Sequence, residues 1–203
     1  MTLATDTRPD SRAKRLKAAT HEAHERVDRA VMAAEPFADH ETYGRFLRFQ
    51  YRLHNHVEPL YADPEFGQIL PELEHRSRLS ALEQDFDDLA LERPSAPAGP
   101  RRELPEALGW LYVVEGSNMG AAFLAKDAAK IGFSEGFGAR HLAGHAEGRG
   151  LHWRSFTDAL DAADLSAGQE AEAEVAAVAA FDHVLALIEE ELAIPTHATD
   201  GPR

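Results

Sequence analysis

The stretch Lys17-Ala-Ala-Thr-His-Glu-Ala-His24-Glu-Arg-Val-Asp28 holds residue types that could bind a metal-containing ligand. Seven and four residues separate Lys17, His24 and Asp28, so one continuous helix would place them on roughly one face. The His24 imidazole could ligate a metal, and Asp28, one turn later, could hold the other ring nitrogen. Lys17 would lie two turns earlier, about 10 Å from His24 along the axis. Because a haem iron lies roughly that far from its propionates, haem is the first ligand to consider.

A second segment, residues 106–124, combines a strongly apolar helical pattern with two internal glycines. Gly116 and Gly120 are four residues apart, on a face that Tyr112 continues. Each glycine costs a helix roughly 1 kcal/mol relative to alanine. Their missing Cβ atoms would let a flat molecule approach the backbone, leaving one side of its iron open to dioxygen. A close crossing with another helix would need the same small residues, so the spacing alone leaves both interpretations open.

Length, charge and composition narrow the class of protein. The 203 residues suit one domain, and a hydrophobic content of 44% is enough for a full core. A formal net charge of −14 argues against unspecific nucleic-acid binding and against docking on an anionic membrane. There are no cysteines, which excludes disulfides, thiolate-ligated haem and cysteine-ligated clusters. No long apolar run or secretory h-region is visible, so we expect a cytoplasmic protein without a membrane span.

Helical spacing runs through nearly the whole chain and predicts an all-α fold. We expect Asp39 to cap the second helix, and Ser166 with Gln169 to cap the last. The expected helices span residues 11–33, 40–62, 66–91, 103–118, 120–131, 149–162 and 167–193. The apolar stripe expected on the last helix consists of Val175, Val178, Phe181, Val184 or Leu185, and Ile188.

The connections between these helices have loop composition. Residues 93–100 are rich in proline, and we expect them to join helices within one domain. Residues 132–148 are rich in glycine and predict an ordered but irregular connection. We expect a single domain over residues 11–194, with flexible ends at 1–10 and 195–203.

Five segments carry a likeness to a known family: Leu16-Lys-Ala-Ala-Thr-His-Glu-Ala-His24, Glu35-Pro-Phe37, Glu58-Pro-Leu-Tyr61, Ala107-Leu-Gly-Trp-Leu-Tyr-Val-Val-Glu-Gly-Ser-Asn-Met-Gly-Ala-Ala-Phe-Leu124 and Phe137-Gly-Ala-Arg-His-Leu142. Through them the sequence resembles the bacterial haem oxygenases of pseudomonads and neisseriae, from about residue 12 to 190. The resemblance implies a single-domain, all-α fold with haem between a proximal and a distal helix. It also implies oxidative cleavage of haem to biliverdin, CO and ferrous iron, using O2 and an external electron donor.

On the proximal side, the resemblance implies that His24 is the iron ligand. Asp28 falls where the family usually has a glutamate bonded to that histidine, and its shorter side chain could bond through water. Lys17 falls on a position that touches the haem propionates in several members.

On the distal side, the resemblance implies catalytic roles for Gly116, Gly120 and Ser117, and a propionate contact for Tyr112. Ser117 departs from mammalian members, which carry an aspartate there that orders distal water. Bacterial relatives of this type use backbone carbonyls and waters instead. Relatives that lack the lysine and tyrosine hold a rotated haem and yield other isomers, so we expect the alpha isomer here.

Partners and competing functions follow from the same resemblance. The electron donor would be a ferredoxin or a flavoprotein reductase, and a bilin-binding photoreceptor could accept the product.

The basic residues of segment 8–29 are interpreted as a solvated face, except Lys17. The competing functions are a haem carrier without catalysis and a haem-free relative of the thiaminase-like kind. His21 is interpreted as exposed, and His54 and His56 point different ways and form no site.

Overall fold

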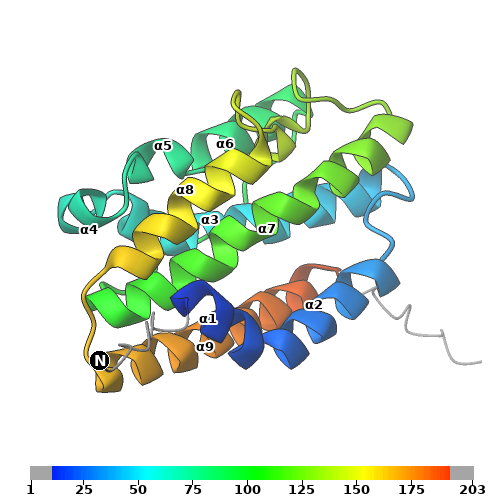
Figure 1. Cartoon of the computed structure of the whole chain (residues 1–203). Helices are drawn as coiled ribbons and strands as arrows, with labels where there is room; N and C mark the ends of the chain where they lie inside the picture. The colour runs from blue at the N-terminus through cyan, green and yellow to red at the C-terminus, as the bar shows by residue number, and fades with distance from the viewer. Residues whose placement is uncertain (1–10, 193–203) are drawn as a thin grey trace, which may run out of the picture.

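The computed structural model describes residues 11–192, so the flexible ends expected at 1–10 and 195–203 lie outside the described residues. Helices account for nearly all regular structure in that range, and the predicted all-α class is confirmed (Figure 1). They are α1 (Arg12–Ala19), α2 (His21–Ala33), α3 (His40–Tyr61), α4 (Pro64–Ile69), α5 (Leu73–Arg76), α6 (Leu79–Asp88), α7 (Leu104–Lys130), the 3-10 helix η1 (Arg140–Leu142), α8 (Arg149–Ala162) and α9 (Ala167–Leu192). Within residues 11–192, none combines the length and the apolar character that a bilayer crossing requires.

The longest helices, α7 and α9, cross at Gly109 and then diverge towards their C-terminal ends (Figure 1). A Cβ built on Gly109 would lie 2.4 Å from the carbonyl oxygen of Ala173 and 2.8 Å from the amide nitrogen of Ala177. Close approach therefore depends on small residues on both helices. For this reason α9 buries a row of alanines, whereas Val175, expected in the apolar stripe, is 70% exposed. The buried alanines are Ala173, Ala176, Ala177 and Ala180.

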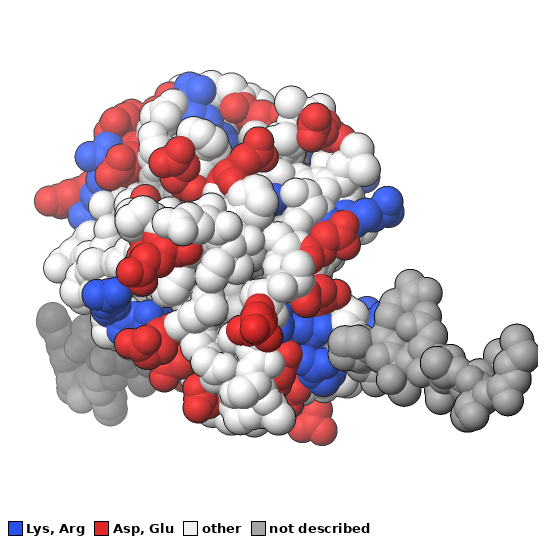
Figure 2. Space-filling view, turned by 60° about the vertical axis from the view of Figure 1, so that its left-hand side comes forward, with Lys and Arg blue, Asp and Glu red and all other residues white. Residues whose placement is uncertain are grey.

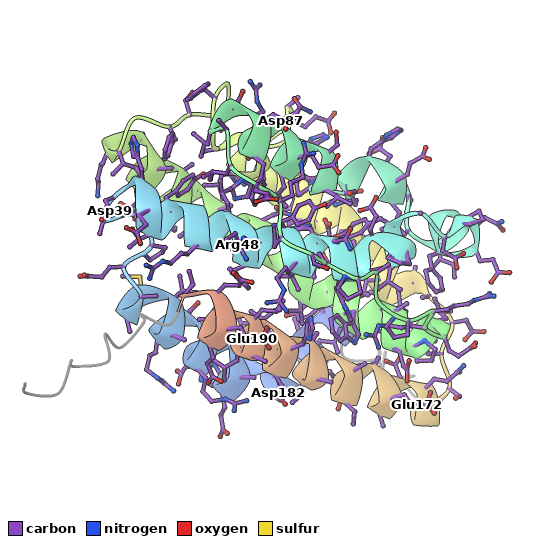
Figure 3. All side chains as sticks on the ribbon, turned by 180° about the vertical axis from the view of Figure 1, so that it is seen from behind. Asp39, Arg48, Asp87, Glu172, Asp182 and Glu190 are labelled. Carbon is purple, nitrogen blue, oxygen red and sulfur yellow. The ribbon has the colours of Figure 1, made fainter. Side chains whose placement is uncertain are left out.

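Helix α9 also packs against α1, α2 and α3. Arg48 and Arg52 of α3 each pair with Glu191 of α9 at 2.8 Å. Figure 3 labels Arg48 and, near the C-terminal end of α9, the neighbouring Glu190. Arg52 also pairs with Glu190 at 2.7 Å. This helix therefore joins α7 and α3 to the helix that carries His24.

The solvated face expected for the basic residues of segment 8–29 is confirmed for Lys14, Arg26 and Arg29, which are exposed, and is wrong for Arg12 and Arg15. Arg8 lies outside the described residues. Arg12 is buried and pairs with Glu170 of α9 at 2.9 Å, and Arg15 contacts the same carboxylate at 2.6 Å. Arg26 pairs with Asp182 at 2.7 Å. In the face shown in Figure 2, acidic and basic side chains are likewise intermixed. These arginines attach α1 and α2 to α9.

Two predicted helices are interrupted by identifiable residues. In place of one helix over 66–91 the chain forms α4, α5 and α6, because Pro71 cannot continue a helix and holds Leu70 extended. Glu72 then adopts a left-handed conformation with φ 60°. The helix expected over 11–33 is broken at Thr20, whose backbone N–H and hydroxyl both donate to the Leu16 carbonyl, at 3.0 Å and 2.7 Å.

Other boundaries follow the sequence more closely. Asp39 caps α3 through a reciprocal bond with Thr42, and Ser166 and Gln169 exchange hydrogen bonds at the start of α9, as predicted. Helices expected separately at 103–118 and 120–131 form one continuous α7. Packing therefore outweighs the propensity cost of its glycines.

Candidate functional site

His24 lies on α2, beside the residues through which that helix packs on α9. Its side chain is 59% exposed. The Nδ1 atom lies 3.0 Å from Oδ2 of Asp28, and the edge of the ring packs against Phe181 at a centroid distance of 5.6 Å. The carboxylate contact is direct, where a water-mediated one had been considered. Because Asp28 engages Nδ1, the orientation leaves Nε2 as the nitrogen for an incoming ligand.

Lys17 is not on the same continuous helix as His24 and Asp28. It lies in the last turn of α1, before the break at Thr20, and its side chain is exposed. The prediction of a single continuous helix is therefore wrong for Lys17. It holds for His24 and Asp28, which are one turn apart on α2.

Neither Gly116 nor Gly120 of α7 lies where the backbone of another helix comes close. A Cβ at Gly120 would have no described atom within 4 Å, and the nearest atom to one at Gly116 is Cη2 of Trp153 at 3.6 Å, an ordinary contact. The interpretation of these two as a helix crossing is therefore wrong, and it applies to Gly109 instead. Packing among the described residues requires neither glycine, although each costs helix stability.

Large apolar side chains on the same face of α7 are also left uncovered. Phe123 is 70% exposed and Met119 is 41% exposed, close to Gly116 and Gly120 along the helix. Contiguous exposed apolar patches are typical of binding surfaces. Ser117 lies off this face, and its hydroxyl donates to the Val114 carbonyl of its own helix at 2.7 Å. We call the face of Tyr112, Gly116, Met119, Gly120 and Phe123 the glycine face.

Tyr112 begins the glycine face and is half-buried. Its ring packs on Trp153 of α8, with centroids 5.7 Å apart, and burial raises the pKa of its phenol. The phenol therefore stays protonated near neutral pH and can donate to a carboxylate. Trp153 was not predicted from the sequence. The available signal was its spacing of three from buried Phe156, which puts both aromatic rings on the inner side of α8.

A buried polar network lies behind the glycine face. Glu115 accepts hydrogen bonds from Arg76 at 3.0 Å and from the Tyr61 hydroxyl at 2.8 Å, and Arg76 and Glu115 are at most 2% exposed. Burial raises the pKa of Glu115, while Arg76 and Tyr61 act in the opposite direction. Because Glu115 points inward, this network fixes the rotation of α7 about its axis. The adjoining Gly116 is thereby turned towards the surface.

A second buried cluster joins α3, α6 and η1. Asp85 accepts hydrogen bonds from the backbone of Arg140 at 2.7 Å and from Nδ1 of His141 at 2.7 Å. Burial lowers the pKa values of His141 and His54. Nε2 of His141 and Nδ1 of His54 have no hydrogen-bond partner among residues 11–192. Segment 140–141 thus anchors the irregular connection to α6.

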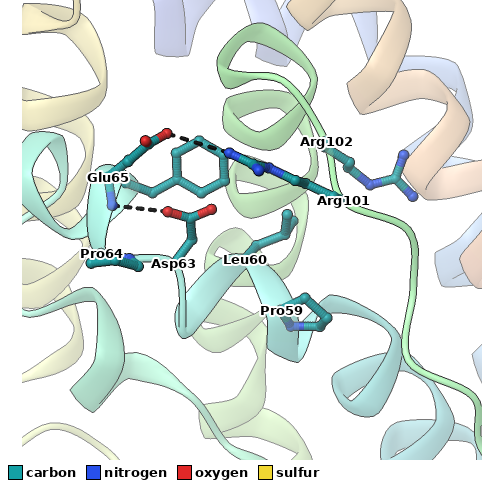
Figure 4. A pocket seen from close by; sticks show the side chains of 8 residues that line it. Pro59, Leu60, Asp63, Pro64, Glu65, Arg101 and Arg102 are labelled. Atoms are coloured by element: carbon teal, nitrogen blue, oxygen red, sulfur yellow. Dashed lines mark hydrogen bonds and ion pairs between the residues drawn. The ribbon is translucent and has the colours of Figure 1, made fainter.

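Two surface hollows lie outside the glycine face. One, of about 410 Å³, is formed where α3 ends and α4 begins, and there Arg101 pairs with Glu65 at 3.6 Å (Figure 4). The other, of about 660 Å³, is lined by Glu22, Arg26 and Arg29 on the side of α2 opposite His24, together with Val178. Neither hollow includes His24 or the glycine face.

Comparisons with known proteins agree on one family. The family model described as Heme oxygenase matches residues 10–190. The chain is 40% identical over 190 residues to Heme oxygenase PigA of Pseudomonas aeruginosa, covering 92% of this chain and 96% of that protein. A crystal structure of the NO- and CO-bound heme oxygenase of Neisseria meningitidis matches with a TM-score of 0.87 and 41% identity, covering 94% of this chain and 96% of that one. The heme oxygenase structure from Leptospira interrogans shares the fold at 18% identity, with a TM-score of 0.71 and coverage of 89% and 99%.

Proposed function

The chain belongs to the haem oxygenase family, and we propose that it uses O2 to cleave haem to the alpha isomer of biliverdin, with release of CO and ferrous iron. Haem is the substrate of this haem-degrading oxidoreductase. Bound haem also supplies the iron at which O2 is activated. The residues of this chain hold the haem, orient it and limit access to it.

The glycine face is the observation that carries the proposal. Gly116 and Gly120 reduce the stability of α7 without serving any contact among the described residues, and Phe123 is left exposed beside them. A flat, apolar ligand would cover this surface and lie against the backbone. His24 of α2 offers a nitrogen whose orientation Asp28 already fixes, so the donor set suits an iron tetrapyrrole.

We assign each site residue a role in holding or orienting the haem. His24 holds the haem iron through Nε2, and Asp28 holds the imidazole by its Nδ1–H. The ammonium of Lys17 and the phenol of Tyr112 hold the propionates and thereby set the rotation of the haem. Gly116, Gly120 and the backbone around Ser117 form the distal surface, which keeps bulky groups away from the reacting side.

The chain has no cysteine with which to hold an iron–sulfur cluster of its own. We propose a ferredoxin or a flavoprotein reductase as the donor. A bilin-binding photoreceptor is our proposal for a product acceptor. The alpha isomer would suit it.

One experiment tests binding, activity and product together. Hemin is added to the purified protein, the Soret band is recorded, and a reductase system with NADPH then supports a single turnover. We expect a sharp Soret band that gives way to biliverdin, with the alpha isomer dominant by chromatography. A complex whose haem is reduced but stays intact would contradict the proposed activity, and another dominant isomer would contradict the proposed rotation.

A further inference from the structure

Trp153 of α8 packs on Tyr112 and lies beside Gly116, so it borders the glycine face at two positions. Its Cη2 and Cζ3 atoms lie 3.6 Å and 3.9 Å from the point where a Cβ on Gly116 would be. Its ring centroid lies 5.7 Å from that of Tyr112, at an interplanar angle of 51°. One indole therefore spans the tyrosine and the first glycine of the face.

Two sets of contacts fix the position of the Trp153 indole, one with Phe156 and one made by Arg149. Trp153 stacks on Phe156, which is 1% exposed, with centroids 5.7 Å apart. One turn earlier on α8, Arg149 donates to the backbone carbonyls of Asn118, at 2.9 Å, and of Leu142. These bonds tie the first turn of α8 to α7, so the indole is held in place beside the glycine face before any ligand arrives.

The glycine face is therefore closed at one end and open at the other. Trp153 borders it at Tyr112 and Gly116, whereas Gly120 has no described neighbour within 4 Å of a built Cβ and Phe123 is 70% exposed. A flat ligand lying across the glycines would meet a rigid aromatic edge at the closed end only. Such an edge restricts rotation of the ligand in its own plane.

We infer that Trp153 is a positioning residue for regiochemistry. It fixes the Tyr112 ring and limits the in-plane rotation of the haem, and through both contacts it favours cleavage at one meso carbon. This inference rests on the proposed function. It adds a residue from α8 to a site otherwise described on α1, α2 and α7.

Trp153→Ala and Trp153→Phe test the inference, with Leu151→Ala as a matched control on the same helix. Leu151 is 57% exposed, so its truncation leaves the Trp153 contacts in place. Two readouts are compared with the wild type: the biliverdin isomers of a single turnover, and the shifted haem methyl proton resonances of the ferric complex, which report haem rotation. For Trp153→Ala we expect the isomer ratio to change by about two- to tenfold, the range set by one aromatic contact. Trp153→Phe should recover most of the wild-type ratio, and Leu151→Ala should match the wild type.

The outcomes separate this inference from the proposed function. If the wild type binds hemin without cleaving it, the proposed activity is wrong, and the methyl resonances still decide the role of Trp153. Unchanged resonances and an unchanged isomer ratio in Trp153→Ala would overturn the inference. Should Trp153→Ala fail to fold, Trp153→Leu replaces it, and a Trp153→Leu spectrum identical to the wild type would overturn the inference equally.

Discussion

At the scale of single residues, the contact between His24 and Asp28 follows from their spacing of one helical turn. The carboxylate lies 3.0 Å from Nδ1, so it favours the tautomer protonated at Nδ1, which leaves the lone pair of Nε2 for a ligand. His21, one turn earlier, is 69% exposed and pairs with Glu25 at 3.4 Å. Two histidines three residues apart on one helix thus have different carboxylate partners.

Because only His24 is proposed as the iron ligand, substitutions of His24 and of His21 should affect hemin binding differently. His24→Ala should remove the sharp Soret band of the hemin complex, and added imidazole should restore it. Asp28→Ala should weaken hemin binding about 10- to 100-fold, as is common when the partner of a ligating histidine is removed. His21→Ala serves as the control in the same spectroscopic titration. A His24→Ala complex with a wild-type spectrum would assign the iron to another side chain.

Lys17 and Tyr112 are expected to act together on the rotation of the haem. The double change Lys17→Asn and Tyr112→Phe removes a cation and a hydroxyl donor, so it should lower the share of the dominant biliverdin isomer in a single turnover. The phenylalanine keeps the ring that packs on Trp153. An isomer pattern identical to the wild type would show that other groups hold the propionates.

The sequence was informative about residues whose partners lie on the same helix. The contact of His24 with Asp28 needed only helical periodicity. The contact of Trp153 with Tyr112 could not be predicted, because it depends on how α8 lies across α7. The continuous helix expected through Lys17 was wrong, because α1 ends at Thr20.

At the scale of elements, the glycines of α7 serve two different purposes. Gly109 sits at the crossing with α9, where a Cβ would lie 2.4 Å from a backbone oxygen. Gly120 faces open space. Sequence spacing could not distinguish these purposes, because it gives the face of a helix and not what covers that face.

Alanine substitutions should therefore have opposite effects on the free energy of unfolding. Gly120→Ala should stabilise the haem-free protein by about 0.5–1 kcal/mol while weakening hemin binding. Gly109→Ala should destabilise it by about 1–3 kcal/mol, because backbone cannot move aside easily. Urea unfolding and hemin titration measure the two quantities. Gly150→Ala on α8, also in open space, is the control that should leave hemin affinity unchanged.

Helix boundaries were predictable where a local cap sets them and wrong where they depend on neighbours. Asp39 and Ser166 act through side-chain bonds to the adjacent backbone, so their helices begin as predicted. The apolar stripe of α9 was misjudged at Val175, because close packing on α7 selects alanines in place of larger residues. The all-α class itself was predictable from periodicity.

At the scale of the whole molecule, burial and partial burial lower the pKa values of several histidines. Burial, with contributions from His141 and Arg78, lowers the pKa of His54 to about 3. Burial also lowers the pKa values of His56 and His152 to about 4. In the unfolded chain a histidine has a pKa of about 6.5. Below that value, these three side chains therefore bind more protons in the unfolded state than in the folded state.

The sign of the pH dependence follows from this difference. Where the unfolded state binds more protons, the free energy of unfolding rises with pH, so acidification from about pH 6.5 should destabilise the protein. Carboxylates with lowered pKa values, such as Asp88 and Glu170, add stability above the unfolded carboxylate pKa of about 4. That contribution is lost only at lower pH. Between about pH 4.5 and 6, a variant that lacks one of these histidines should differ from the wild type in how its free energy of unfolding changes with pH.

The substitution His54→Leu removes one of the histidines whose pKa is lowered, and so measures its contribution to the pH dependence of unfolding. Leucine is apolar and cannot titrate, so the variant should lose up to about 1.4 kcal/mol per pH unit from the slope of unfolding free energy between about pH 4.5 and 6. Carboxylates common to both proteins cancel in the comparison. Urea unfolding at a series of pH values measures the slopes, and His75→Gln, at a position 77% exposed, provides the control. Parallel slopes for the wild type and His54→Leu would mean that His54 takes up no additional proton on unfolding. The acid sensitivity of the fold would then have to come from other groups.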